Sequence, residues 1–207
     1  MKRILFTSFL LLGFLLYGQK IEEQTITDYT IKSIVVEGDA IFKIEINTSN
    51  AKSIKIKSRI EGEYSKHTKI KSEINNGTLS ITCDYPKLTN RTDDKLNAHK
   101  VHSIDININI PKYLNVYIKS AIASAKISGA FKNLLLELNQ GNAQVLNFTG
   151  NGIINTMNGN INLETNNAVI KAKTRTGIIK KEKIEESKNQ IEITSINGNI
   201  NVYKTKN

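Results

Sequence analysis

Four segments in the second half of the chain share one pattern and follow one another at a nearly constant step. They are Leu136–Leu146, Ile154–Glu164, Ala172–Glu182 and Ile193–Tyr203. Each has a glycine in a short polar turn between two apolar-alternating runs. These glycines are Gly141, Gly159, Gly177 and Gly198, and the step from Gly177 to Gly198 is slightly longer than the two before it. This period predicts a stack of β-coils, because one coil cannot bury its apolar face alone.

The apolar positions align in columns that would build a continuous interior, and a fifth, degenerate coil aligns before the four. The first column contains Ile118, Leu136, Ile154, Ala172 and Ile193. The second contains Ala125, Ala143, Ile161, Ile179 and Ile200. The third contains Ile127, Val145, Leu163, Lys181 and Val202, with Lys181 as the exception. The longer last step is explained by the polar insertion Glu182–Asn189, which we expect to be a protruding loop.

Almost every other segment also alternates at period two, which predicts half-buried strands and negligible helix after the N-terminal segment. Asn75-Asn76-Gly77-Thr78 predicts a hairpin turn, and the polar stretch Lys87–His102 predicts a long surface loop. We therefore expect an all-β fold. An N-terminal half of antiparallel-like strands and hairpins would merge into a single-stranded β-solenoid, a β-helix-like stack with coils of about 18 residues.

The chain begins with two basic residues, a mostly apolar run from Ile4 to Tyr17, and the small residue Gly18. This is the pattern of an export signal, and the run is short for a membrane span, which needs roughly 20 apolar residues. We expect residues 1–18 to be a cleaved signal peptide, 19–28 an N-terminal linker and 29–207 one β-domain. An uncleaved N-terminal anchor is the alternative. After cleavage, the chain would not be an integral membrane protein.

The formal net charge of +10 is spread over lysine pairs that share one face of a strand. Such stripes form a solvated face that discourages edge-to-edge association, or they attract an acidic glycan or lipid surface. The candidate surface-binding residues are Lys55, Lys57, Lys171 and Lys173. Nucleic acid is disfavoured, because the chain is exported and lacks a platform of interleaved aromatic residues.

No residues form a convincing catalytic, cofactor or metal site. Cys83 is the only cysteine and shares a strand face with Leu79 and Ile81, so we expect a buried structural thiol. His99 and His102, with Asp105 nearby, lack a third nitrogen or sulfur ligand close in sequence and are expected to be surface residues. An asparagine follows the glycine in three turns, at Asn142, Asn160 and Asn199. Stacked asparagines form structural hydrogen-bond ladders; binding of a polar ligand by these rows is the alternative.

The order of these parts resembles the auto-transporter adhesin, head GIN domain family of exported bacterial proteins. The resemblance rests on Asn-Gly-Thr-Leu-Ser-Ile at Asn76–Ile81, Ile-Pro-Lys-Tyr-Leu at Ile110–Leu114, and Asn-Gly-Asn-Ile-Asn at Asn158–Asn162 and Asn197–Asn201. It covers about residues 29 to 204. It implies a right-handed β-solenoid of the cell envelope with no catalytic residues. The family often has Ser-Gly or Gly-Asp in these turns, where this chain has Asn-Gly-Asn.

These observations favour a non-enzymatic, exported protein of the periplasm, outer cell surface or exterior, acting as an adhesin-like binding or structural module. Its partner would be an unknown envelope protein or an acidic glycan or lipid surface. Two alternatives remain. One is a periplasmic sensor or assembly partner that adds a strand at an uncapped edge, which the chain order places at the C-terminal coil. The other is a polysaccharide-acting solenoid enzyme.

Overall fold

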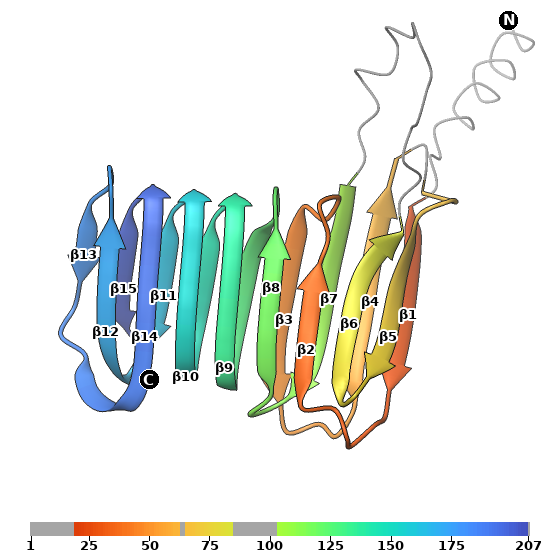
Figure 1. Ribbon diagram of the computed structural model, residues 1–207, viewed down its shortest axis with the longest axis horizontal. Coiled ribbons are helices and arrows are strands. Elements are labelled where there is room, and N and C mark those ends of the chain that lie inside the picture. Colours follow the sequence, from red (N-terminus) through yellow and green to blue (C-terminus); the bar gives the residue numbers. More distant parts are fainter. Residues whose placement is uncertain (1–18, 63–64, 85–102, 207) are drawn as a thin grey trace, which may run out of the picture.

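The computed structural model describes residues 19–62, 65–84 and 103–206. These residues form one open mixed sheet of fifteen strands and contain no helix (Figure 1). The strands are β1 (Lys20–Ile26), β2 (Ser33–Glu37), β3 (Lys43–Ser49), β4 (Ile54–Glu61), β5 (Lys69–Asn75), β6 (Thr78–Asp84), β7 (Ser103–Pro111), β8 (Asn115–Ser120), β9 (Ser124–Gln140), β10 (Ala143–Asn158), β11 (Ile161–Thr165), β12 (Asn167–Thr174), β13 (Ile179–Lys181), β14 (Glu185–Asn197) and β15 (Ile200–Lys204). In this part of the chain, no helix is long and apolar enough to cross a membrane.

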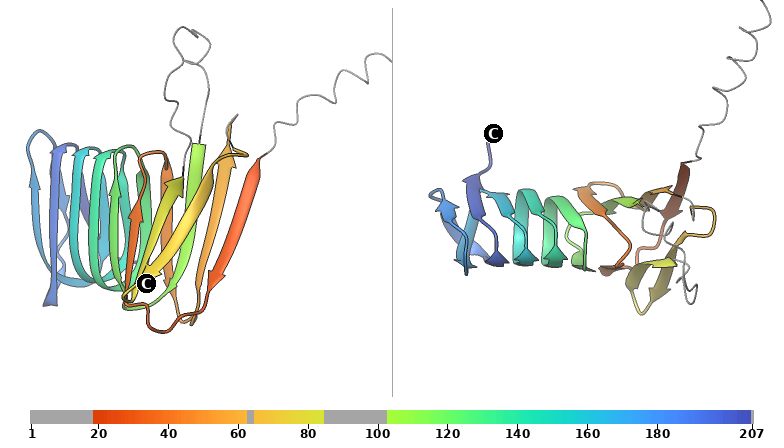
Figure 2. Two further views of the ribbon diagram at one scale, coloured as in Figure 1. Left: turned by 45° about the vertical axis from the view of Figure 1, so that its right-hand side comes forward. Right: turned by 90° about the horizontal axis from the view of Figure 1, so that it is seen from above.

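The sheet turns back on itself, so that the strands lie in two layers around a shared interior (Figures 1 and 2). One layer follows the order β1-β4-β7-β3-β9-β10-β11-β15-β13. The other follows β5-β6-β2-β8-β9-β10-β14-β12. The long strands β9 and β10 belong to both layers, because each one bends near its middle. In β10 the bend lies at Gly150, whose φ of 133° suits glycine.

The strand register matches the predicted columns residue by residue. In the first column, Ile118 lies beside Leu136 and Leu136 beside Ile154. Residues of β9 thus pair with those one repeat later in β10, as the repeat predicts. The inward side chains of these columns are almost completely buried and form one Ile-rich core, except for Ala172, Ile179 and Lys181 in the coil of β12 and β13. One face of each layer packs against the other layer, and the opposite face is exposed to solvent. Apolar and polar residues therefore alternate along the strands, with the β-branched residues pointing inward.

The spatial order of the last two coils differs from their order in the chain. Ile154 of β10 pairs with Ile193 of β14, which skips the coil of β12, and Ala172 of β12 pairs with Ile193 from the other side. In the second layer β15 likewise lies between β11 and β13. The prediction that the C-terminal coil forms the edge of the stack is therefore wrong. The coil of β12 and β13 forms that edge instead (Figure 1).

The N-terminal half continues the same two layers. β2 and β3 are parallel to β8 and β9, while antiparallel pairing is confined to β1–β4, β4–β7 and β5–β6. The predicted hairpin turn joins β5 to β6, with positive φ at Asn76 and Gly77. Lys20–Ile26, within the segment expected to be a linker, pairs with β4 along its whole length as β1. The predicted Lys87–His102 loop lies outside the described residues.

Candidate binding groove

A shallow groove of about 610 Å³ runs across the outer surface of the layer that contains β8, β9, β10, β14 and β12. Pockets of this size are common for small ligands. Outward-facing side chains form most of its surface, because alternate residues of each strand point away from the core. The lining residues are Tyr117, Asn133, Leu134, Leu135, Asn151, Gly152, Ile153, Val169, Lys171, Lys188, Gln190, Ile191 and Glu192.

The floor is an apolar row that crosses three neighbouring strands. Tyr117, Leu135 and Ile153 occupy one register position on β8, β9 and β10. Tyr117 is 38% exposed and Ile153 is 45% exposed. Solvent-exposed apolar side chains aligned on a strand face indicate a contact surface more often than isolated ones do.

A ladder of carboxamides forms one side of the groove. The Nδ2 of Asn133 donates to Oδ1 of Asn115 at 2.8 Å, and Nδ2 of Asn151 donates to Oδ1 of Asn133 at 3.4 Å. The backbone N–H of Gln190 donates to Oδ1 of Asn151 at 3.0 Å. Each amide group carries two N–H donors. The ladder therefore fixes the orientation of the side chains and leaves further donors for a polar ligand.

A bulge in β14 adds a charged side chain to the groove, beyond the carboxamide ladder. Between the pairs Asn167–Glu185 and Val169–Gln190 the register of β12 and β14 shifts, so that β14 has extra residues there. Ser187 Oγ ties the bulge to the carbonyl of Asn167 at 2.9 Å. The bulge brings Lys188 to the groove. The expected loop Glu182–Asn189 is thus only partly a loop, since its second half belongs to β14.

The four lysines predicted to bind a surface do not lie together. Lys171 lines the groove, and Lys173 lies two residues further along β12. Lys55 and Lys57 lie on β4, near the other end of the sheet (Figure 1). Lys57 forms an ion pair with Glu23 of β1 at 2.6 Å.

Sequence reasoning missed the apolar floor of the groove. Tyr117, Leu135 and Ile153 recur once in each repeat, at positions where an alternating strand should be polar. Apolar residues at these outward positions could therefore have been recognised in the sequence. Lys188 and Glu192 gave no such signal, because their place beside β10 depends on the exchanged order of the last two coils.

The asparagines of the glycine turns have the predicted structural role. Oδ1 of Asn142 accepts from the backbone N–H of Asn160 at 2.8 Å, and Oδ1 of Asn160 accepts from that of Asn199 at 2.8 Å. Oδ1 of Asn199 accepts from the N–H of Ile178 at 2.9 Å. Each carboxamide thus binds the backbone of the next coil in space, and the predicted ladder is confirmed.

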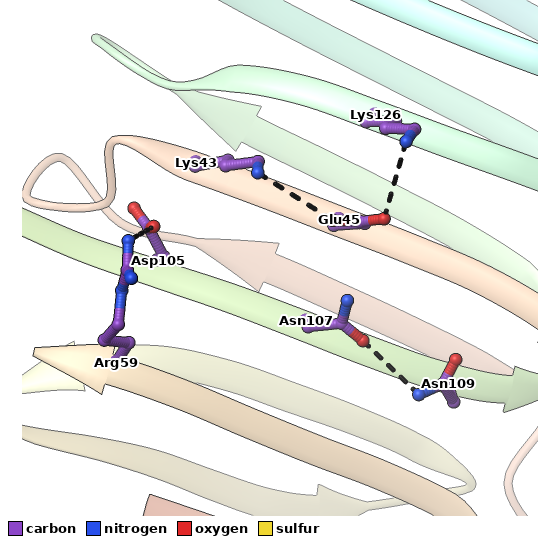
Figure 3. Close-up of polar contacts among 7 residues, drawn as sticks. All are labelled: Lys43, Glu45, Arg59, Asp105, Asn107, Asn109 and Lys126. Atoms are coloured by element: carbon purple, nitrogen blue, oxygen red, sulfur yellow. Dashed lines mark hydrogen bonds and ion pairs between the residues drawn. The ribbon is translucent and has the colours of Figure 1, made fainter. Parts of the chain in front are cut away.

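Several charged groups of β3, β4, β7 and β9 in the other layer are paired (Figure 3). Arg59 Nη2 lies 2.9 Å from Oδ2 of Asp105, and Glu45 lies 3.8 Å from Lys126. Asp105 had been considered with His99 and His102, which lie outside the described residues. Within residues 19–62, 65–84 and 103–206, no group of three His, Cys, Asp or Glu residues is arranged to hold a metal ion.

Cys83 is half-buried and packs against the core, as expected for a structural thiol. Burial, together with the negative charges of Asp84 and Glu22, raises the pKa of its thiol to about 11. Only the thiolate reacts readily. We expect iodoacetamide labelling of the folded protein to accelerate with pH up to about 11, whereas labelling in urea should level off near the ordinary cysteine pKa of about 8.5. Equal pH profiles in both states, followed by mass spectrometry, would contradict the buried position.

Comparison with known proteins was made at the level of both sequence and structure. No family model matches the sequence, and no curated protein matches it. A protein from Clostridium sporogenes ATCC 15579, provisionally described as a cell adhesion protein, has a similar structure with a TM-score of 0.66. The match has 19% identity and covers 90% of this chain and 100% of that one. The two chains share a fold.

A second structure, from Bacteroides fragilis NCTC 9343 and provisionally described as an adhesin, matches with a TM-score of 0.41 and 12% identity. That match covers 91% of this chain and 98% of the other.

Proposed function

We propose that this chain is an exported, non-enzymatic, adhesin-like binding module of the cell envelope, which binds a surface molecule in the groove over β8, β9, β10, β14 and β12. The observation that carries the proposal is the in-register apolar row Tyr117–Leu135–Ile153 beside a carboxamide ladder. An apolar floor with a few oriented polar groups is the usual composition of a binding site. The cell-adhesion description of the Clostridium sporogenes protein agrees with this function.

The finer parts of the proposal rest on the sequence. We propose that residues 1–18 are a signal peptide and that 29–207 form a β-solenoid of the head GIN domain type. The constant one-repeat offset between β9 and β10 and between β10 and β11 supports the solenoid. The compartment would be the periplasm, the outer surface or the exterior.

The composition of the groove favours binding over glycoside hydrolysis. Hydrolysis of a glycosidic bond commonly uses two carboxylic groups on opposite sides of the bond. Glu192 is the one carboxylate among the residues that line the groove. A polysaccharide-acting enzyme would need a second acid here, so a binding module is the better proposal.

Substitution of one floor residue tests the proposed function. Purified chain starting at Gln19 would be titrated onto the envelope fraction of the producing cells. We expect Ile153→Asp to weaken binding about tenfold or more, because burying an isoleucine side chain contributes roughly 1.5–3 kcal/mol. The control is Ile74→Asp on β5, because Ile74 is also 45% exposed but lies outside the groove. Equal binding by wild type and Ile153→Asp would refute a role for the groove.

A further inference from the structure

The coil at the edge of the stack carries an unusual concentration of positive charge. We call residues 171–183, which contain the second half of β12 and all of β13, the basic end. Its six cations are Lys171, Lys173, Arg175, Lys180, Lys181 and Lys183. Glu182 is its one carboxylate, so six positive charges and one negative charge give +5. This short segment therefore supplies half of the formal net charge of +10.

The six cations form no direct ion pair within the described chain, although Glu192 is the cross-strand neighbour of Lys171. None of them has a carboxylate oxygen within 4.0 Å among the described residues. Lys181 instead donates from Nζ to the carbonyl of Ile170 at 2.9 Å. Elsewhere the structure does pair its surface charges, as in Lys57–Glu23 at 2.6 Å and Lys71–Asp84 at 2.9 Å. The unpaired cations thus leave a field that an anionic partner would complement.

Two exposed isoleucines lie in this segment, between Arg175 and Lys180 in the sequence. Ile178 is 63% exposed and Ile179 is 41% exposed. Ile179 belongs to a core column, whose other members are buried, but within the described residues β13 has a neighbouring strand, β15, on one side only. The basic end therefore combines aliphatic side chains with surrounding positive charge.

We propose that the basic end docks onto an anionic lipid surface, sharing only Lys171 with the groove. Each Lys or Arg held near an anionic bilayer adds about 1 kcal/mol of attraction, and exposed aliphatic residues gain further by entering the headgroup boundary. An acidic polysaccharide would satisfy the cations but offers no apolar environment to Ile178. A second copy of the same end would place like charges against each other, which opposes pairing through this edge.

This docking orients the molecule. The basic end lies at one end of the long axis, and the groove opens on the side of the stack (Figure 1). A stack attached by its end therefore projects from the lipid surface and keeps Tyr117, Leu135 and Ile153 accessible.

Vesicle co-sedimentation tests the proposal. The chain starting at Gln19, which contains every described strand, would be mixed with vesicles of phosphatidylcholine alone or with about 30% phosphatidylglycerol, a fraction of roughly physiological anionic content. We expect binding only to the anionic vesicles, and weaker binding at high salt. The double variant Lys180→Glu/Lys183→Glu should lower the partition coefficient by about a thousandfold, since each reversal removes one attraction and adds a repulsion of similar size. Ile178→Ser should lower it by about tenfold.

The control is Lys55→Glu/Lys57→Glu, which makes the same change in net charge on β4 near the other end of the sheet. It should bind nearly as wild type, and circular dichroism and thermal melting should show that all variants remain folded. Equal loss in the control and the test variant would show that net charge alone matters and would overturn the proposal. Absence of vesicle binding, or binding to soluble polygalacturonate in preference to vesicles, would also overturn it. Loss of envelope binding by Ile153→Asp with vesicle binding intact would separate the groove from the basic end.

Discussion

We expect a chain that ends at Asn189 to lose the ordered state of β12 and β13. This chain lacks most of the paired region of β14 and all of β15. β12 pairs with β14, and β13 pairs with β15, so both lose their strand partners. The deletion also removes four buried apolar side chains: Ile191, Ile193, Ile200 and Val202. At roughly 1.5–3 kcal/mol each, they contribute about 6–12 kcal/mol, similar to the net stability of a whole domain.

Limited trypsin digestion measures this effect directly. Cleavage after Lys171, Lys173 and Arg175 should become much faster in the shortened chain, because cleavage follows local unfolding. If the coils were stacked in chain order, β12 and β13 would stay paired with the preceding coil, and cleavage there would remain slow.

The matched control is an internal deletion of the edge coil. Ile154 and Ile193 are paired in space. Removing residues 168–188 shortens the sequence between them to one step of the repeat. This is the same step that separates paired residues of β9 and β10. We expect this variant to fold with β14 and β15 as its last coil and to unfold cooperatively. Failure of this variant to fold would show that the edge coil is needed for the rest of the stack.

Gly159→Ala is expected to lower the free energy of unfolding by about 3 kcal/mol. This value is the upper end of the usual destabilisation caused by overpacking. A Cβ at Gly159 would collide with the backbone carbonyl oxygen of Gly141. Backbone cannot move aside as a side chain can, so the two coils must separate. The melting temperature should fall by about 6–12 °C for a chain of this size.

Gly152→Ala on the same strand, β10, provides the comparison. Its Cβ would meet Cζ of Phe148 at 3.3 Å, which is a side-chain contact that can shift. We expect a change of about 1 kcal/mol or less, because replacing glycine also reduces the freedom of the unfolded chain. Equal destabilisation by the two substitutions, measured by urea denaturation, would contradict the close approach of the backbones at Gly159.

The columns and turns were predictable because each depends on local sequence. Alternation determines which side chains point inward, and the glycine spacing determines which residues of successive coils lie side by side. The exchange of the last two coils was not predictable in this way. Ala172 and Ile193 both fit the position beside Ile154, so the first column does not decide between them. Lys181 in the third column was the one sign that its coil lies at the edge, where Val202 separates it from Leu163.

The glycine turns carry the same ambiguity. Gly198 lies against Gly159, and Gly177 lies against Gly198, which reproduces the exchanged order. The sequence pattern of the turns permits either order. The apolar floor of the groove was within reach of the sequence, since Tyr117, Leu135 and Ile153 share the period of the repeat. The positions of Lys188 and Glu192 were not, because the two residues lie beside β10 only through the exchanged order.

The exchanged order has a kinetic consequence for a chain that emerges from its N-terminus. When β12 first becomes available, the position beside β10 is empty, and a transient register with Ala172 against Ile154 forms there. This register is too weak to keep β12 ordered, because Ala172, Ile179 and Lys181 fill the three apolar columns less well than Ile193, Ile200 and Val202 do. β14 appears later and must displace β12 from this trap before the final pairs can form. We therefore expect refolding to show a slow phase that reports strand exchange, and its rate to depend on how strongly β12 holds the provisional position. The internal deletion of residues 168–188 removes the competitor and should abolish that phase.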